Sequence, residues 1–207
     1  MLQTFHSLRP SLRIGLLLAL LLPACGDGDS SRREVLAGDI AIAHTPPGGY
    51  GEMMPAPILA ACTEPLVAGA PDLRGTWTVV AAERGGRPVE PNDPIFEHVQ
   101  RIEQCGDRLV VTGGGVVHDM RCDGTVENGV HDVAAADFTT PITVVATYED
   151  GVHVLRPVGI GVEITRRREA DEMIWNYLNM VVRLRSDDYV DHDNSRAPES
   201  QGSQSSS

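Results

Sequence analysis

The sequence predicts an all-β protein: an antiparallel up-and-down meander that closes into a small barrel of about eight to ten strands. Short runs of alternating apolar and polar residues recur along the chain, and turns rich in glycine and aspartate separate them. No segment longer than a turn has the apolar period of a helix. Because consecutive runs read as hairpins, a meander is favoured over a crossover topology.

The first predicted strand covers residues 75–81. Alternation places Trp77, Val79 and Ala81 on one face of this strand. Residues 84–94 are rich in glycine and proline, which predicts a long loop across one end of the domain.

Turn signals organise the middle of the chain. Cys105-Gly106-Asp107 separates two predicted strands, and Asp123-Gly124 follows a third. Asn128-Gly129 is the strongest short hairpin signal, because the central residues of a type I′ turn both need positive φ. We therefore expect a two-residue hairpin at Asn128-Gly129.

The clearest predicted hairpin joins residues 142–149 to residues 152–156 through Asp150-Gly151. A two-residue loop fixes the register, so that Tyr148 faces His153. The apolar face of this hairpin is expected to point inward and consists of Ile142, Val144, Ala146, Tyr148, His153 and Leu155.

The last predicted hairpin pairs residues 162–168 with residues 173–177, and residues 180–185 follow as a closing strand. The arginines at 166, 167 and 168 form the only basic cluster in an acidic chain. We interpret this cluster as a solvated strand end, with an anionic partner such as lipid phosphates as the alternative.

The chain begins with features of a bacterial signal peptide. Arg9 and Arg13 precede an apolar run of about ten residues, which is too short to span a bilayer. Leu22-Pro23-Ala24-Cys25 resembles a lipobox, and this resemblance implies that Cys25 is the lipidated first residue of the mature chain. Gly26 differs from the aspartate that retains many lipoproteins in the inner membrane, which favours the outer membrane. An ordinary secretory signal, with Cys25 a simple thiol, is the alternative.

Composition divides the rest of the chain. Residues 25–72 are rich in glycine, proline and alanine, and we expect a flexible tether there, although its apolar patch over 57–67 could dock on the domain. Residues 73–185 are the predicted β domain, and residues 186–207 are expected to be disordered. The net charge of −12 argues against nucleic acid as a partner.

After Cys25, three cysteines remain in a chain expected to meet oxidising conditions, which allows one disulfide. In a meander, Cys105 and Cys122 are separated by a whole strand, about 9.6 Å between strand axes, beyond the reach of a disulfide. We therefore favour Cys62 with Cys105, followed by Cys62 with Cys122.

Gly75-Thr76-Trp77, followed by a long loop and a meander, resembles the G-x-W start of lipocalins over about residues 73–185. The resemblance implies that Trp77 closes the bottom of the barrel, that Arg183 or Arg185 packs on it, and that the interior holds a small apolar ligand. The residues expected to line that ligand are Trp77, Val144, Tyr148, His153 and Leu155.

His118-Asp119, His131-Asp132 and His153 invite a metal interpretation, but no zinc-binding spacing is present. We interpret them as solvated histidines and turn-capping aspartates, and we expect no metal, no cofactor and no catalytic residues. The sequence favours a lipid-anchored envelope protein that binds a small apolar ligand. The alternative is an envelope protein interaction module, such as an inhibitor or assembly subunit, without a ligand.

Substituting Cys25→Ser is expected to release the protein from the membrane fraction, because the lipid is attached through the Cys25 thiol. Cell fractionation with an immunoblot measures the release, and labelled palmitate should enter the parent chain only. Retention of the variant in the membrane fraction would contradict anchoring through Cys25.

Overall fold

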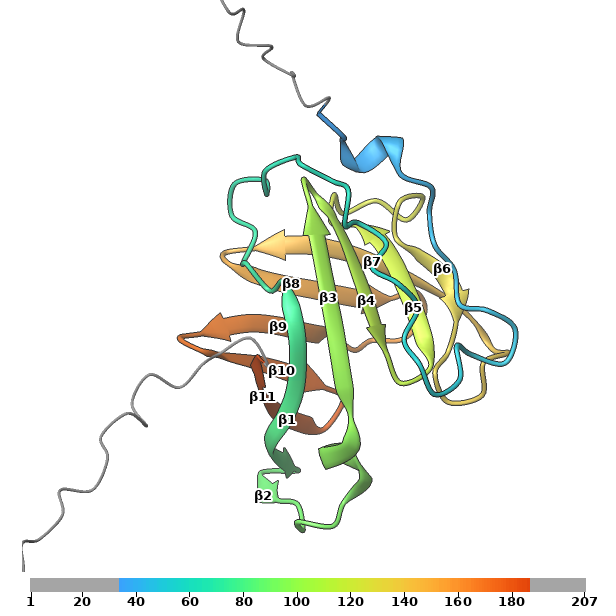
Figure 1. The fold of residues 1–207 in the computed structure, drawn as a ribbon. Coiled ribbons are helices and arrows are strands. Elements are labelled where there is room, and N and C mark those ends of the chain that lie inside the picture. The colour runs from blue at the N-terminus through green and yellow to red at the C-terminus, as the bar shows by residue number, and fades with distance from the viewer. Residues whose placement is uncertain (1–33, 187–207) are drawn as a thin grey trace, which may run out of the picture. The chain divides into compact units, whose positions relative to one another are not determined.

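The computed structural model describes residues 34–186, and ten of its strands follow one antiparallel path. The order along this path is β5-β4-β3-β1-β11-β10-β9-β8-β7-β6, with a short β2 added to β1 (Figure 1). The strands are β1 (Gly75–Arg84), β2 (Arg87–Pro88), β3 (Val99–Cys105), β4 (Arg108–Gly113), β5 (Val116–Arg121), β6 (Val130–Val133), β7 (Pro141–Glu149), β8 (Val152–Pro157), β9 (Ile164–Glu169), β10 (Glu172–Tyr177) and β11 (Met180–Ser186).

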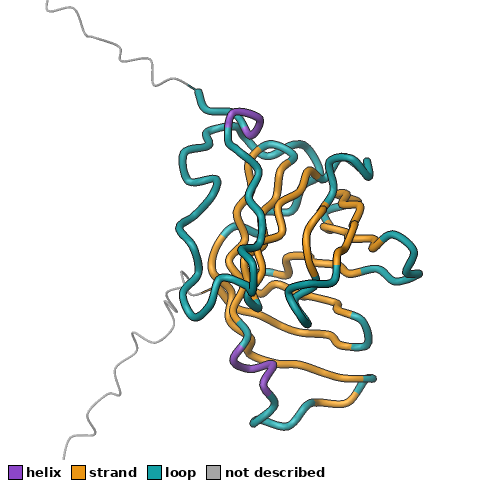
Figure 2. The backbone as a smooth tube through the Cα atoms, turned by 90° about the vertical axis from the view of Figure 1, so that its right-hand side faces the viewer, coloured by secondary structure: helices purple, strands orange, loops and turns teal. Residues whose placement is uncertain are grey.

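This path confirms the predicted all-β meander, which forms a nearly closed barrel. The helical elements in residues 34–186 are two short 3₁₀ turns, η1 (Ala37–Asp39) and η2 (Pro94–Glu97). They lie at opposite ends of the barrel (Figures 1 and 2). No helix among these residues is long and apolar enough to cross a membrane. The expected signal peptide, Cys25 and the expected tail from residue 187 onward lie outside the described residues.

The hairpin at Asp150-Gly151 has the predicted register. Tyr148 pairs with His153, and both turn residues have positive φ, as a type I′ turn requires. The face expected to point inward does so: Val144, Ala146, His153 and Leu155 are buried, and Ile142 and Tyr148 are partly buried against the core.

A β-bulge changes the inward face of β1. Trp77 and Val79 point into the core as predicted, but the register with β11 shifts between Val79 and Ala81. Ala82 is therefore buried, while Ala81 is exposed, which corrects the predicted assignment of Ala81. A bulge inserts one extra residue and reverses the side-chain alternation beyond it.

The hairpin expected at Asn128-Gly129 does not form. Residues 122–129 make a longer connection between β5 and β6, and neither Asn128 nor Gly129 has positive φ. Gly129 is required for a different reason, because a side chain there would collide with the carbonyl oxygen of Val144 on β7. β6 pairs with β7, so β5 and β6 are the two ends of the strand path.

The N-terminal residues 34–67, which we call the strap, pack against the outer face of β3, β4 and β5. Figure 1 shows this segment in blue and teal, passing β6 and returning across β5 before the chain enters β1. Ala37 and Leu59 of the strap form a second apolar cluster with Val110 and Val117 of the sheet. The described part of the expected tether is therefore attached to the barrel, because the outer face beneath it is apolar.

The strap also closes the seam between β5 and β6. Thr45 bridges the two strands: its hydroxyl accepts from the Val117 amide at 3.0 Å, and its amide donates to Asp132 Oδ2 at 2.9 Å. Around them, the Arg121 amide donates to the Asn128 carbonyl at 2.8 Å. β5 and β6 are therefore linked by these hydrogen bonds from the strap and the β5–β6 connection, and not by a direct β-ladder.

Cys62 and Cys105 form a disulfide with a Cα to Cα distance of 6.2 Å, as predicted. Cys105 points outward from β3 beneath the strap, whereas Cys122 belongs to the inward-facing core. Cys122 is therefore kept apart from the other two cysteines mainly because it lies on the opposite face of the sheet, and less because of the distance between strands.

Substituting Cys105→Ser is expected to lower the free energy of unfolding by about 2 to 4 kcal/mol, because the disulfide closes a long loop in the unfolded chain. The two half-cystines are 43 residues apart. Urea denaturation of oxidised protein measures the change, with Cys122→Ser as a control that keeps the disulfide. Non-reducing peptide mapping that finds Cys62 free would contradict the pairing.

Candidate functional site

The barrel interior contains all five residues expected to line a ligand. Trp77 and His153 are fully buried, Val144 and Leu155 are buried, and Tyr148 is partly buried against the same core. The structure therefore brings them to one interior face.

Trp77 closes one end of this interior. Its indole Nε1 donates to the Leu73 carbonyl at 2.7 Å. The guanidinium of Arg168 on β9 lies over the ring at 5.5 Å. Arg183 and Arg185, expected in this role, instead point outward and form ion pairs with Glu172. They alternate with the inward Val182 and Leu184 on β11, which explains why neither reaches Trp77.

Tyr148 belongs to the same closed end. Gln104 Nε2 crosses the interior and donates to the Tyr148 hydroxyl at 3.0 Å, and the Gln104 side-chain oxygen accepts from the Leu73 amide at 2.6 Å. Burial raises the pKa of Tyr148, and it raises the pKa of the neighbouring Cys122 thiol to about 12, so both groups stay neutral. Tyr148 therefore has a structural partner and is not free to orient a ligand.

A second set of interior residues lies between this closed end and η2. We call it the polar cluster, and it consists of His98, Gln100, His153, Arg166 and Trp175. Arg166 Nε on β9 reaches across the barrel and donates to Gln100 Oε1 on β3 at 3.1 Å. The same guanidinium lies 5.4 Å from the ring centre of Trp175, whose ring stacks with His98 at 5.2 Å.

Register explains why these residues meet. Arg166 pairs with His153 on one neighbouring strand and with Trp175 on the other, and paired residues share a face of the sheet. Arg166 is only 5% exposed, which corrects the interpretation of this residue as part of a solvated strand end. Arg167 points outward and pairs with Glu169, and Arg168 is exposed, so the interpretation holds for these two residues.

Several polar atoms of the cluster have no hydrogen-bond partner in the protein. These atoms are His98 Nε2, Gln100 Nε2, both ring nitrogens of His153, Arg166 Nη1 and Trp175 Nε1. Leaving a buried polar group without a partner costs about 1 to 3 kcal/mol. Interiors of folded proteins rarely keep several such atoms together without a ligand or solvent to satisfy them.

Burial controls the charges of the cluster. It lowers the pKa of Arg166 to about 10, so the guanidinium remains positive at neutral pH. Burial and the positive charge of Arg166 both lower the pKa of His98 and of His153. Arg166 has no ion pair with any carboxylate of residues 34–186, so the cluster carries one uncompensated positive charge.

Gln100, Arg166 and Trp175 were not among the residues expected to line a site. The signal was present in the predicted hairpin, because pairing residues 162–168 with 173–177 puts Arg166 on the face opposite Arg167. No local sequence pattern indicates Gln100 or His98 as site residues. They approach Arg166 and Trp175 only when β3 closes over β9 and β10.

The other histidine pairs do not form a metal site. His118 faces the interior, where its Nε2 lies 3.0 Å from the Val133 carbonyl, and His131 is exposed. Asp119 and Asp132 are not turn caps, because their carboxylates accept from strap amides at Ala43 and Thr45. Among residues 34–186, the one grouping with metal-ligand spacing is Cys62, Glu64 and Cys105, two of which form the disulfide.

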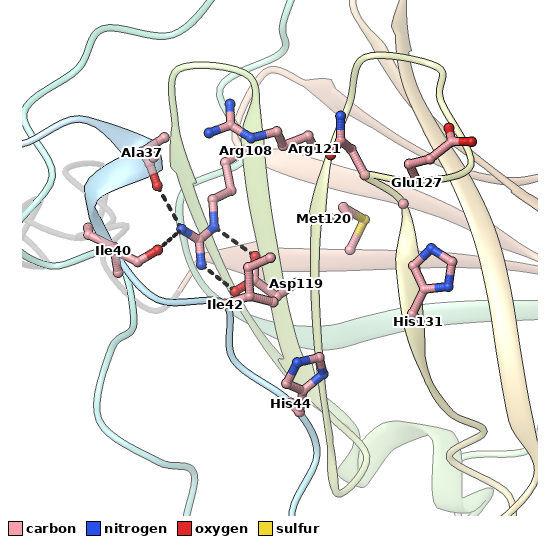
Figure 3. A pocket seen from close by; sticks show the side chains of 13 residues that line it. Ala37, Ile40, Ile42, His44, Arg108, Asp119, Met120, Arg121, Glu127 and His131 are labelled. Atoms are coloured by element: carbon pink, nitrogen blue, oxygen red, sulfur yellow. Dashed lines mark hydrogen bonds and ion pairs between the residues drawn. The ribbon is translucent and has the colours of Figure 1, made fainter.

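A cavity of about 190 Å³ lies outside the barrel, between the strap and the connection from β5 to β6. Figure 3 shows Arg108 filling one side of it, with its guanidinium directed at the carbonyls of Ala37 and Ile40 and at Asp119. His131 and Glu127 border the opposite side. The guanidinium of Arg108 is already satisfied by these contacts, so this cavity offers little free donor capacity.

Comparison with known proteins assigns no family, since no family model and no curated protein matches the sequence. Seventeen chains of solved structures match this chain in part. Human cRBP IV shares 12% identity over 56% of this chain and 98% of its own, with a TM-score of 0.42. A zebrafish ileal bile acid-binding protein complexed with cholic acid shares 14% identity over 55% and 95%, with a TM-score of 0.38. Likenesses this distant carry no argument about what the present barrel binds.

Lowering the pH from 7.5 to 5.5 is expected to destabilise the fold. His98, His118 and His153 have a lowered pKa in the folded state, so the unfolded chain takes up more protons as the pH falls through about 6.5. A histidine that stays neutral in the fold contributes a loss of about 1.4 kcal/mol over this range.

Urea denaturation at several pH values tests this expectation. His153→Phe should reduce the pH-dependent loss by about 1 kcal/mol. A parent-like pH dependence in His153→Phe would contradict the buried neutral state of His153.

Proposed function

We propose that this chain is a lipid-anchored protein of the cell envelope whose barrel binds a small, largely apolar molecule bearing a polar group. The supporting observation is the polar cluster, a group of buried nitrogens without partners inside a barrel whose core is mainly apolar. Ligand sites in proteins combine an apolar lining with a few convergent polar groups, and this interior has that composition.

The end of the barrel near η2 supports a route to the cluster. Apolar side chains there are only partly buried, in contrast to the fully buried Trp77 and Leu73 at the closed end. The partly buried set at this end consists of Val89, Ile95, Phe96, Ile164, Tyr177 and Met180. An apolar portion of a ligand would contact these side chains while its polar group reaches the cluster.

Anchoring in the membrane is supported by the resemblance of Leu22-Pro23-Ala24-Cys25 to a lipobox, and Gly26 favours the outer membrane. A lipid on Cys25 would hold the barrel beside a bilayer, where apolar molecules are concentrated.

An interaction module is the second candidate. Val158, Ile160 and Leu178 are 54%, 59% and 61% exposed, and they lie in the β8–β9 loop and the β10–β11 turn. Both connections lie at one end of the barrel, because Asn176 pairs with Thr165. This is the η2 end, because Met180 pairs with Arg84, where β1 ends ahead of η2. Exposed apolar side chains on neighbouring loops are typical of protein contact sites.

Native mass spectrometry of the full chain, extracted from its own host, separates the two candidates. Carrier function predicts a small-molecule adduct on the parent protein and on Val181→Phe, which adds bulk at an exposed outer position. Val144→Phe, which adds the same bulk to the buried interior, should lose the adduct while keeping a cooperative thermal transition. A parent protein that carries no adduct but copurifies with a protein partner would contradict the carrier and favour the interaction module.

A further inference from the structure

We infer that the group recognised by the polar cluster is an oxyanion, a carboxylate at the end of a short apolar chain, with Arg166 as its counterion. This inference rests on the proposed function and specifies the chemical class of the ligand. It depends on three properties of the cluster: the direction of its free hydrogen bonds, its charge, and its position in the barrel.

The free hydrogen bonds are mainly donors. Gln100 Nε2, Arg166 Nη1 and Trp175 Nε1 lack partners, and all three nitrogens can only donate. The orientation of the Gln100 amide follows from its Oε1, which accepts from Arg166 Nε at 3.1 Å. A neutral alcohol or amide would leave part of this donor set unsatisfied, whereas a carboxylate offers acceptor oxygens and no donor.

The charge of the cluster also favours an anionic ligand. Arg108, the other buried arginine, pairs with Asp119 at 2.6 Å, and strap carbonyls accept its remaining N–H groups. Arg166 has one hydrogen bond, to the neutral Gln100, and no carboxylate of residues 34–186 pairs with it. Keeping a buried charge without a partner is costly, so a monoanion that supplies the missing charge gains affinity.

The position of the cluster limits the ligand. His153 is fully buried and Gln100 is 1% exposed, so the anionic group sits within the barrel and not at its rim. The closed end below it is filled by Trp77, Gln104 and Tyr148, which leaves the η2 end for the rest of the molecule. A single planar guanidinium with one positive charge matches a planar, singly charged carboxylate better than a doubly charged phosphate.

The two tryptophans provide matched reporters. The chain contains two tryptophans, and their indole N–H groups have different surroundings. Trp175 Nε1 belongs to the free donor set, whereas Trp77 Nε1 already donates to Leu73. In a ¹⁵N-¹H spectrum, the two indole signals therefore report the polar cluster and the closed end separately.

The experiment titrates octanoate and octan-1-ol, which share a chain length, into the whole chain from residue 25 onward carrying Cys25→Ser, so that no detergent is needed. Octanoate should shift the Trp175 indole signal saturably and bind roughly tenfold or more tightly than octan-1-ol, because a hydrogen bond to a charged group is stronger than a neutral one. The Trp175 signal should shift more than the Trp77 signal, because Trp77 pairs with Gln100 but its Nε1 already donates to Leu73. Trp175→Phe assigns the two signals.

Arg166→Gln should weaken octanoate binding by roughly tenfold or more while leaving octan-1-ol binding unchanged. Arg168→Gln is the matched control, since Arg168 lies two residues further along the same strand face but contacts Trp77. Arg168→Gln should bind both probes like the parent chain.

Equal affinity for the two probes, or parent-like octanoate binding by Arg166→Gln, would overturn the anion assignment while leaving the proposed carrier function intact. A shift of the Trp77 signal alone, or no saturable shift with octanoate, would also overturn it. Loss of the carrier function itself is detected separately, by the absence of any adduct on the protein from its own host.

Discussion

The buried ion pair between Arg108 and Asp119 is the interaction on which the architecture outside the strands depends. Its side chains are 4% and 1% exposed, and all five guanidinium N–H groups have acceptors, two on Asp119 and three on strap carbonyls. A buried pair is tolerated when each partner is fully hydrogen-bonded, and this condition is met only with the strap in place. The strap and the barrel are therefore parts of one folded unit.

The strap in turn solves a problem created by the meander. An up-and-down path leaves two edge strands, here β5 and β6, whose backbone groups need partners. Thr45 joins these strands through a side-chain and a backbone hydrogen bond, and the Cys62–Cys105 disulfide fixes the return of the strap over β3. The strap therefore covers the sheet edge as an irregular segment and does not add another strand.

The two buried arginines differ in how completely the protein itself satisfies their guanidinium groups. Arg108 is completely satisfied by its own chain, as expected for a group whose role is to hold elements together. Arg166 is equally buried but has one neutral partner, and it stands among histidine, glutamine and tryptophan nitrogens that also lack partners. Stability alone does not account for such a group, whereas a ligand with acceptor oxygens does.

The local signals in the sequence determined the strands, the Asp150-Gly151 hairpin with its register and the burial of Trp77, and the strand order of a meander favoured Cys62 with Cys105. Each depends on alternation, turn chemistry or chain order, which neighbouring residues carry. The tertiary structure alone decided that residues 34–67 cover the sheet, that Arg168 and not Arg183 or Arg185 packs on Trp77, and that Arg166 meets Gln100. These contacts join strands that are distant in sequence, and they depend on which strands face each other across a barrel, a long-range property that local alternation does not encode.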